Sequence, residues 1–143
     1  MRAKIWNLIL ICGALTVMLG AANEAAAQTD RQRAVRLRSG VAVRGFVGGE
    51  GRMGYVIRAR RGQTIVVEIS RTVPRDGNFN LTVSRSGDFM EAEAVRFGRE
   101  TNTRRLLRWT GRAPASGNYY FYLTGYSPNP PNGIRYVLKA AVR

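Results

Sequence analysis

Side chains that can bind an anion or a sugar gather in the C-terminal third of the chain. Arg104, Arg105 and Arg108 surround Trp109. Arginine neutralises phosphate while aromatic rings stack on bases or sugars, a pattern typical of single-strand nucleic-acid platforms and also suited to anionic envelope polymers. The alternative places Trp109 in the hydrophobic core, and burial is the more frequent fate of such a residue. An anion-binding site at these four residues is therefore the second of two hypotheses.

The first hypothesis concerns the turn Ser116-Gly117-Asn118-Tyr119, which opens an aromatic strand. Exposed tyrosine and arginine are enriched at the centres of protein interfaces. The alternative is that the turn only redirects the chain and buries Tyr119. The nearby segment Ser127 to Gly133 contains three prolines, so it cannot join a strand ladder and is expected to be an exposed hairpin loop. With this loop, the predicted partner-binding residues are Ser116, Gly117, Asn118, Tyr119, Tyr120, Arg112, Tyr126 and Asn129.

Catalysis is not expected from this composition. The chain has no histidine, and its one cysteine, Cys12, lies in the N-terminal apolar run. The usual general base, zinc ligand and Ser-His or Cys-His pairs are therefore missing, and Ser116 has no base beside it. Asp88, Glu91 and Glu93 could bind a cation or act as paired carboxylates, but balancing nearby arginines explains them more simply. We predict no enzymatic activity, no cofactor and no metal site.

The first 27 residues read as a secretory signal peptide. Arg2 and Lys4 precede an apolar run, and Ala25-Ala26-Ala27 supplies an Ala-x-Ala cleavage site. We expect export to the periplasm or beyond, and no later segment is apolar enough to cross a bilayer.

The predicted mature domain, residues 28–143, is strongly basic. Without Arg2, Lys4 and Glu24 the counts of 23 bases and 9 acids become 21 and 8, a net charge of +13. All but one of these bases are arginine, which binds phosphate, sulfate and carboxylate through its planar fork. An anionic partner and a general compositional preference for arginine explain this excess equally well.

Short apolar segments recur about every ten residues, a cadence typical of a β-sandwich or barrel. We predict one domain, a single antiparallel, jelly-roll-like sandwich of about eight strands. The candidate strands are Ala34 to Arg38, Val41 to Val47, Met53 to Ala59, Thr64 to Ser70, Asn78 to Ser84, Ala92 to Phe97, Arg104 to Trp109, Tyr119 to Thr124 and Ile134 to Val142.

Alternation along these strands assigns their faces, because residues two apart share a side. The turn Arg60-Arg61-Gly62-Gln63 is predicted to close a hairpin, with Gly62 at positive φ. The inward residues are expected to be Tyr55, Ile57, Ala59, Ile65, Val67, Ile69, Tyr119, Phe121, Leu123, Tyr136, Leu138 and Ala140, and the outward ones Arg58, Glu68, Tyr120, Tyr122 and Arg135.

The order of these motifs resembles the bacterial pre-peptidase C-terminal domain family of small secreted β-sandwiches. The matching segments are Gly45 to Gly51, Tyr55 to Ala59 with Arg61-Gly62-Gln63, Pro114 to Tyr119, and Tyr136-Val137-Leu138. They cover nearly all of the predicted mature chain, although each motif is short.

Within that group, a free-standing domain behind a signal peptide is similar to periplasmic inhibitors of goose-type lysozyme. The resemblance implies that Ser116 to Tyr119 belongs to the loop offered to the lysozyme cleft. The expected function is thus non-catalytic binding, with a lysozyme as partner. The alternatives are an anionic envelope polymer, with nucleic acid less expected outside the cell, or an accessory structural module without a ligand.

Overall fold

The computed structural model describes residues 33–48, 51–73, 77–89, 97–103, 105–127 and 133–143. The predicted signal peptide, most of the predicted strand Ala92 to Phe97, and the candidate site residues Arg104 and Asn129 lie outside these ranges. The signal peptide and the domain boundary at residue 28 therefore stay predictions. Within the described part, no helix is long and apolar enough to cross a membrane.

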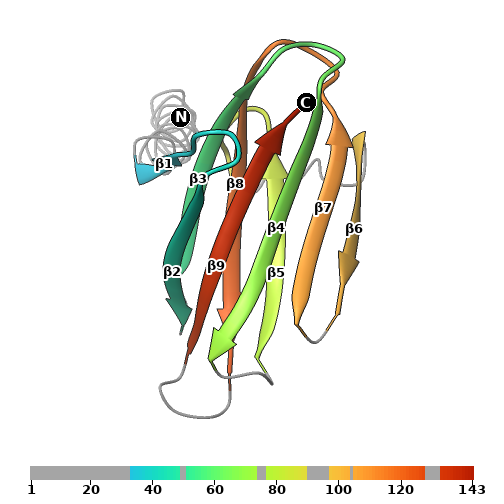
Figure 1. The fold of residues 1–143 in the computed structure, drawn as a ribbon. Coiled ribbons are helices and arrows are strands. Elements are labelled where there is room, and N and C mark those ends of the chain that lie inside the picture. The colour runs from blue at the N-terminus through green and yellow to red at the C-terminus, as the bar shows by residue number, and fades with distance from the viewer. Residues whose placement is uncertain (1–32, 49–50, 74–76, 90–96, 104, 128–132) are drawn as a thin grey trace, which may run out of the picture.

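The described strands form two sheets that face each other (Figure 1). The predicted all-β sandwich is therefore confirmed. The four-stranded sheet has the order β1 (Val35–Arg36), β3 (Arg52–Ala59), β8 (Gly117–Tyr126) and β5 (Asn78–Ser84). The five-stranded sheet has the order β2 (Ala42–Gly48), β9 (Gly133–Val142), β4 (Thr64–Val73), β7 (Leu106–Arg112) and β6 (Gly98–Asn102).

Two features of the sheets differ from the prediction. Strand β6 lies at residues predicted to connect two strands, because its sequence Gly-Arg-Glu-Thr-Asn carries no apolar alternation. It is an edge strand held by pairing with β7, from Gly98 opposite Gly111 to Asn102 opposite Leu107. The short strand β1 pairs with β3 in the parallel sense, so the sandwich is not wholly antiparallel.

Most connections carry the chain from one sheet to the other. The predicted hairpin at Arg60 to Gln63 is wrong, because β3 and β4 lie in opposite sheets and do not pair. The same holds for β7 and β8, and for β8 and β9 around the predicted hairpin loop Ser127 to Gly133. Among the described strands, only β6 and β7 are both consecutive and paired. A turn motif in a sequence does not show whether the flanking strands share a sheet.

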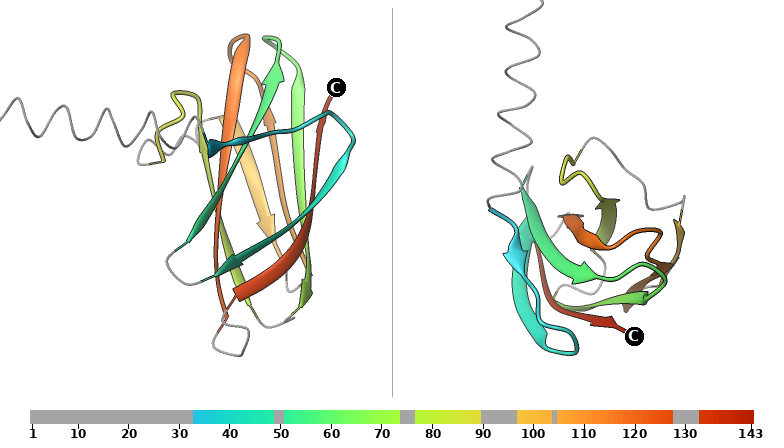
Figure 2. Two further views of the ribbon diagram at one scale, coloured as in Figure 1. Left: turned by 90° about the vertical axis from the view of Figure 1, so that its left-hand side faces the viewer. Right: turned by 90° about the horizontal axis from the view of Figure 1, so that it is seen from above.

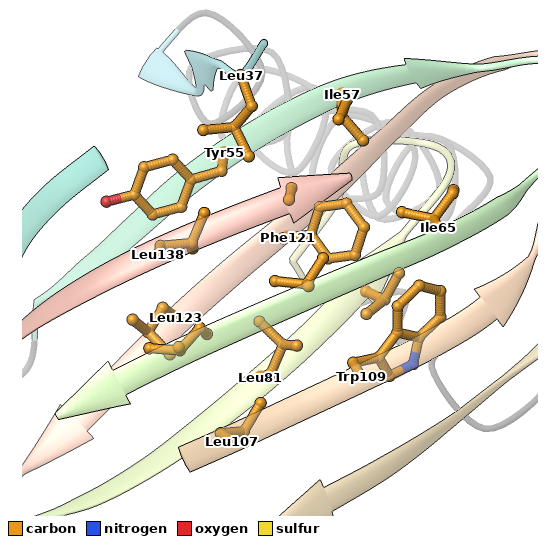
Figure 3. Packing of buried hydrophobic residues seen from close by; sticks show 14 of the residues in the cluster. Leu37, Tyr55, Ile57, Ile65, Leu81, Leu107, Trp109, Phe121, Leu123 and Leu138 are labelled. Atoms are coloured by element: carbon orange, nitrogen blue, oxygen red, sulfur yellow. The ribbon is translucent and has the colours of Figure 1, made fainter. Parts of the chain in front are cut away.

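The space between the sheets is filled by alternate residues of the long strands (Figure 3). All the residues predicted to face inward are buried, as the alternation required. Their rings meet edge to face, the arrangement that aromatic quadrupoles favour. Trp109 contacts Phe97 and Phe121 at centroid distances of 5.7 and 5.5 Å, and Phe79 contacts Tyr136 at 5.7 Å.

Trp109 occupies the β6–β7 side of this core. Its side chain has 0% relative exposure. The indole ring lies against Gly98 and Gly111, where an added Cβ would come within 2.2 and 2.4 Å of ring atoms. Residues with side chains at these two paired positions would displace the ring, so the glycines make the space for Trp109.

The prediction that the Tyr122 side chain is exposed on the outer face of its sheet is wrong. The side chain does point away from the core, but its exposure is 1% because the segment Ser84 to Phe89 folds over it. The Tyr122 hydroxyl donates to the carbonyl of Gly87 at 2.6 Å, and the Phe89 ring meets the Tyr122 ring edge to face at 5.8 Å. Arg52 in turn lies 4.7 Å from the centroid of Phe89. This contact joins residues from two strands and a loop, which alternation within one strand cannot reveal.

A polar pair lies inside the core, where the hydroxyls of Tyr55 and Tyr136 are 2.5 Å apart and share a hydrogen bond. Tyr55 lies on β3 and Tyr136 lies on β9, and these strands belong to opposite sheets. The hydrogen bond therefore joins the two sheets directly. Burial raises the pKa of Tyr55 and that of Tyr136 above the usual value of a tyrosine.

We expect Tyr55→Phe and Tyr136→Phe each to lower the free energy of unfolding by about 1–3 kcal/mol, because each leaves one buried hydroxyl without its partner. The double variant should lose less than the sum of the two, since it removes both hydroxyls. Urea unfolding of the four proteins measures the coupling. Strictly additive losses would show that the two hydroxyls do not depend on each other.

The same pair predicts a pH dependence. The folded-state pKa values are raised, so the unfolded chain releases these protons first as the pH increases. This contribution to stability is complete below about pH 10 and is lost at higher pH. The fall in unfolding free energy between neutral and alkaline pH should be smaller in the double phenylalanine variant. An equal fall in both proteins would contradict the assignment.

Candidate functional site

Two turns lie side by side at one end of the sandwich, and each carries the chain across from sheet to sheet (Figures 1 and 2). The first, Arg60 to Gln63, joins β3 to β4, and the second, Ala113 to Ser116, joins β7 to β8. At their bases Ala59 pairs with Gly117 and Thr64 pairs with Arg112. We call these two turns, together with Arg58, Arg112 and Asn118 beside them, the arch end.

Main-chain hydrogen bonds join the two turns. The amide of Gly62 donates to the carbonyl of Ala113, and the amide of Ala113 donates to the carbonyl of Gln63, both at 2.8 Å. Gly62 adopts φ of 85°, as predicted, which an L side chain rarely tolerates. The backbone polar groups of each turn are thus hydrogen-bonded to those of the other turn, which holds the two turns together.

Side chains complete the contact between the turns. Ser116 Oγ accepts a hydrogen bond from the amide of Arg61 at 2.9 Å, and Arg112 Nε donates to the carbonyl of Gly62 at 3.0 Å. Within the first turn, Gln63 Oε1 accepts from the amide of Arg60 at 2.7 Å. Ser116 is exposed, and its hydroxyl also links the two turns.

Tyr119 is a residue of the core. It has 0% exposure, and its hydroxyl donates to the carbonyl of Ala115 at 2.6 Å, which fixes the second turn from below. Of the predicted Ser116 to Tyr119 motif, only Ser116 is exposed, while Gly117 and Asn118 are partly exposed. Tyr120 is also partly exposed, on the outer face of the four-stranded sheet opposite Val56. The surface at this turn is thus formed mainly by Ser116 and Asn118.

Cations border this surface. Arg60, Arg61 and Arg112 are exposed in or beside the two turns, and Arg58 is exposed on β3 directly opposite Asn118. The described acids, Glu68, Asp88 and Glu100, lie in neither turn nor in the residue pairs at their bases. Sequence reasoning assigned Arg58, Arg60 and Arg61 no binding role, because nothing in their spacing shows that they lie beside Ser116. The Arg-Arg-Gly-Gln turn could have suggested exposure but not this proximity.

Tyr126 does not belong to the same surface, although its side chain is 65% exposed. The ten-residue strand β8 begins at the Ser116 turn and ends at Tyr126, a length of about 30 Å. Tyr126 and Ser116 therefore lie at opposite ends of β8 and do not form one surface. Residues 128–132 of the predicted loop surface, Asn129 included, lie outside the described ranges.

The described residues of the second candidate site, the predicted anion-binding cluster around Trp109, do not lie together on one surface. Trp109 is buried, so its ring cannot stack on a base or a sugar at the surface of the folded protein. Arg108 points to the other side of β7, where its Nε lies 3.6 Å from a carboxylate oxygen of Glu68. Arg105 is exposed beside β7, and its carbonyl accepts from the amide of Arg71. Successive residues of a strand point to opposite faces of its sheet, so Arg108 and Trp109 do not form one site.

The described residues contain no group of three acidic, histidine or cysteine side chains that could hold a metal ion. Glu91 and Glu93 of the predicted acidic cluster lie outside the described ranges. The chemistry that the arch end offers is hydrogen bonding and ion pairing with an anionic partner.

We expect Ser116→Ala to lower the unfolding free energy by about 0.5–1.5 kcal/mol, because the amide of Arg61 loses its acceptor at an exposed position. Ser70→Ala on an exposed position of β4 is the matched control and should have almost no effect. Urea unfolding compares them. Equal stability of the two variants would show that Ser116 does not join the turns.

No family model and no curated protein matches the sequence. Solved structures do match. The pre-peptidase C-terminal domain of a collagenase from Bacillus anthracis is 16% identical with a TM-score of 0.53, over 75% of this chain and 93% of that one. PliG from Aeromonas hydrophila, a periplasmic inhibitor of g-type lysozyme, is 23% identical with a TM-score of 0.55, over 77% and 96%. The chain therefore has the β-sandwich fold that these two proteins share.

Proposed function

We propose that this chain is an exported, non-catalytic binding protein that inhibits goose-type lysozyme through its arch end. The observation that carries the proposal is the pair of hydrogen-bonded turns that presents Ser116 and Asn118 among exposed arginines. The shared fold supports it as well, because one protein with this fold is an inhibitor of that enzyme class.

Rigidity suits the arch end to inhibition. An inhibitor that is ordered before binding loses less conformational entropy in the complex, which improves affinity. The backbone bonds between Gly62, Ala113 and Gln63 and the Ser116 Oγ bond provide that order in the free protein. Partner contacts fall to the residues that project beyond these bonds, namely Asn118 and the side chains of Arg58, Arg60 and Arg61.

The charge of the arch end suits a glycosidase cleft. Glycoside hydrolysis depends on carboxylates, which an inserted arginine can pair with in a charge-assisted hydrogen bond. The high net charge of the whole chain would repel a basic lysozyme, but salt screens that repulsion beyond a Debye length of about 8–10 Å. The local match between arginine and cleft carboxylates acts at contact distance, where screening is weak.

An inhibition assay tests the proposal, with goose-type and chicken-type lysozymes measured in parallel on the same cell-wall substrate. We expect micromolar protein to slow lysis by the goose-type enzyme. Replacing three exposed arginines in R58Q/R60Q/R61Q should weaken inhibition at least about tenfold, because each lost charged contact is worth about a kcal/mol or more.

The control is R44Q/R135Q/K139Q, which removes the same charge from exposed positions on the outer face of the five-stranded sheet. It should inhibit as the unchanged protein does. Lytic rates unaffected by the unchanged protein would refute the inhibitor assignment. Equal loss of inhibition in both triple variants would refute the arch end as its surface and point to overall charge instead.

A further inference from the structure

The outer face of the five-stranded sheet is a second surface with a distinct chemistry. Figure 1 shows this sheet toward the viewer, with no described helix or strand in front of β9, β4 and β7. Alternation and register place on this face Ala42, Arg44, Phe46, Thr64, Val66, Glu68, Ser70, Arg99, Thr101, Leu106, Arg108, Thr110, Arg112, Arg135, Val137, Lys139 and Ala141. Apart from Phe46 and Leu106, its uncharged side chains are small, so the long cations project beyond them.

This face is strongly cationic. Its six exposed cations are Arg44, Arg99, Arg108, Arg112, Arg135 and Lys139, and its single described acid is Glu68. Glu68 lies on the central strand between Arg108 and Lys139 in the same cross-strand row, and it pairs with Arg108. The other four exposed cations, Arg44, Arg99, Arg112 and Arg135, have no described carboxylate opposite them in the register, which leaves a field that attracts anions.

The register arranges five of these cations along a path. It runs from Arg99 on β6 through Arg108 on β7 and Lys139 on β9 to Arg44 on β2 and Arg135 back on β9. Strand spacing of about 4.8 Å and residue rise of about 3.4 Å put consecutive Cα atoms about 8–10 Å apart. Long, flexible arginine and lysine side chains can adjust their charged groups along such a path.

We propose that this face binds a linear, phosphate-bearing polymer along the path from Arg99 to Arg135. Four of the five cations are arginines, whose planar fork fits phosphate oxygens in a bidentate manner. A flexible chain can follow the twist of a five-stranded sheet, whereas a flat membrane surface can contact only part of it.

The scarcity of aromatic side chains distinguishes this polymer from a nucleic acid. Single-strand binding platforms stack successive bases on exposed rings. Phe46, 46% exposed, is the one aromatic residue that the described part of this face presents. Ion pairing and counterion release therefore account for the binding, and the polymer needs no bases.

The test is a salt titration of binding to long-chain inorganic polyphosphate. Four cations of the path, all except Arg108, form no ion pair with a described carboxylate. This predicts a log–log salt slope of about −3 and an affinity about 60-fold lower at 200 mM than at 50 mM salt. In R44Q/R135Q/K139Q the slope should weaken by about 2. The matched variant R58Q/R60Q/R61Q loses equal charge at the arch end and should keep the slope of the unchanged protein.

Two further probes separate the polymer from other anionic partners. An oligothymidylate of equal charge should bind no more tightly than polyphosphate, and phosphatidylcholine vesicles containing phosphatidylglycerol should bind more weakly. Preference for the oligothymidylate or for the vesicles would overturn the proposal. So would a salt slope equal in both triple variants, or no binding of polyphosphate at low salt. None of these results bears on lysozyme inhibition, which is measured separately.

Discussion

The structure depends on a chain that crosses between its two sheets at nearly every described connection. Because consecutive strands enter opposite sheets, the layers are joined by short turns at their ends and by side chains between them. The two turns of the arch end stabilise each other through main-chain hydrogen bonds, and the Tyr55–Tyr136 bond joins the layers within the core. An exposed segment held in place by hydrogen bonds therefore lies at the arch end, as a result of the need to connect the sheets.

The features of the fold that depend on neighbouring residues in the sequence were predicted correctly. Alternation of apolar residues located the long strands and the inward residues, and Gly62 marked a turn with positive φ. Sheet membership depends on pairing between distant residues, so the predicted hairpins at Arg60 to Gln63 and at Ser127 to Gly133 were wrong. For the same reason the polar edge strand β6 and the covering of Tyr122 by the segment before and including Phe89 were not predicted.

The candidate sites were likewise predicted where they depend on local sequence and not where they depend on contacts between distant residues. The Ser116 turn was predicted as a surface, but its position beside Arg60 and Arg61 depends on two connections far apart in sequence. Likewise, Trp109 and Arg108 are neighbours in sequence and lie on opposite faces of one strand. The fold places exposed arginines at the arch end and on a cationic sheet face, and we propose a different partner for each of these two surfaces.

The central claim is that the arch end is ordered in the free protein and is the surface that meets a lysozyme. Amide hydrogen exchange tests it most directly, with residue-level readout at Arg61, Gly62 and Ala113, whose amides donate across the two turns. The account predicts slow exchange of all three in the free protein and further slowing with goose-type lysozyme, while exchange around Arg44 and Lys139 stays unchanged. Exchange of the three amides as fast as in an unfolded chain, or lysozyme protection confined to the sheet face, would contradict it.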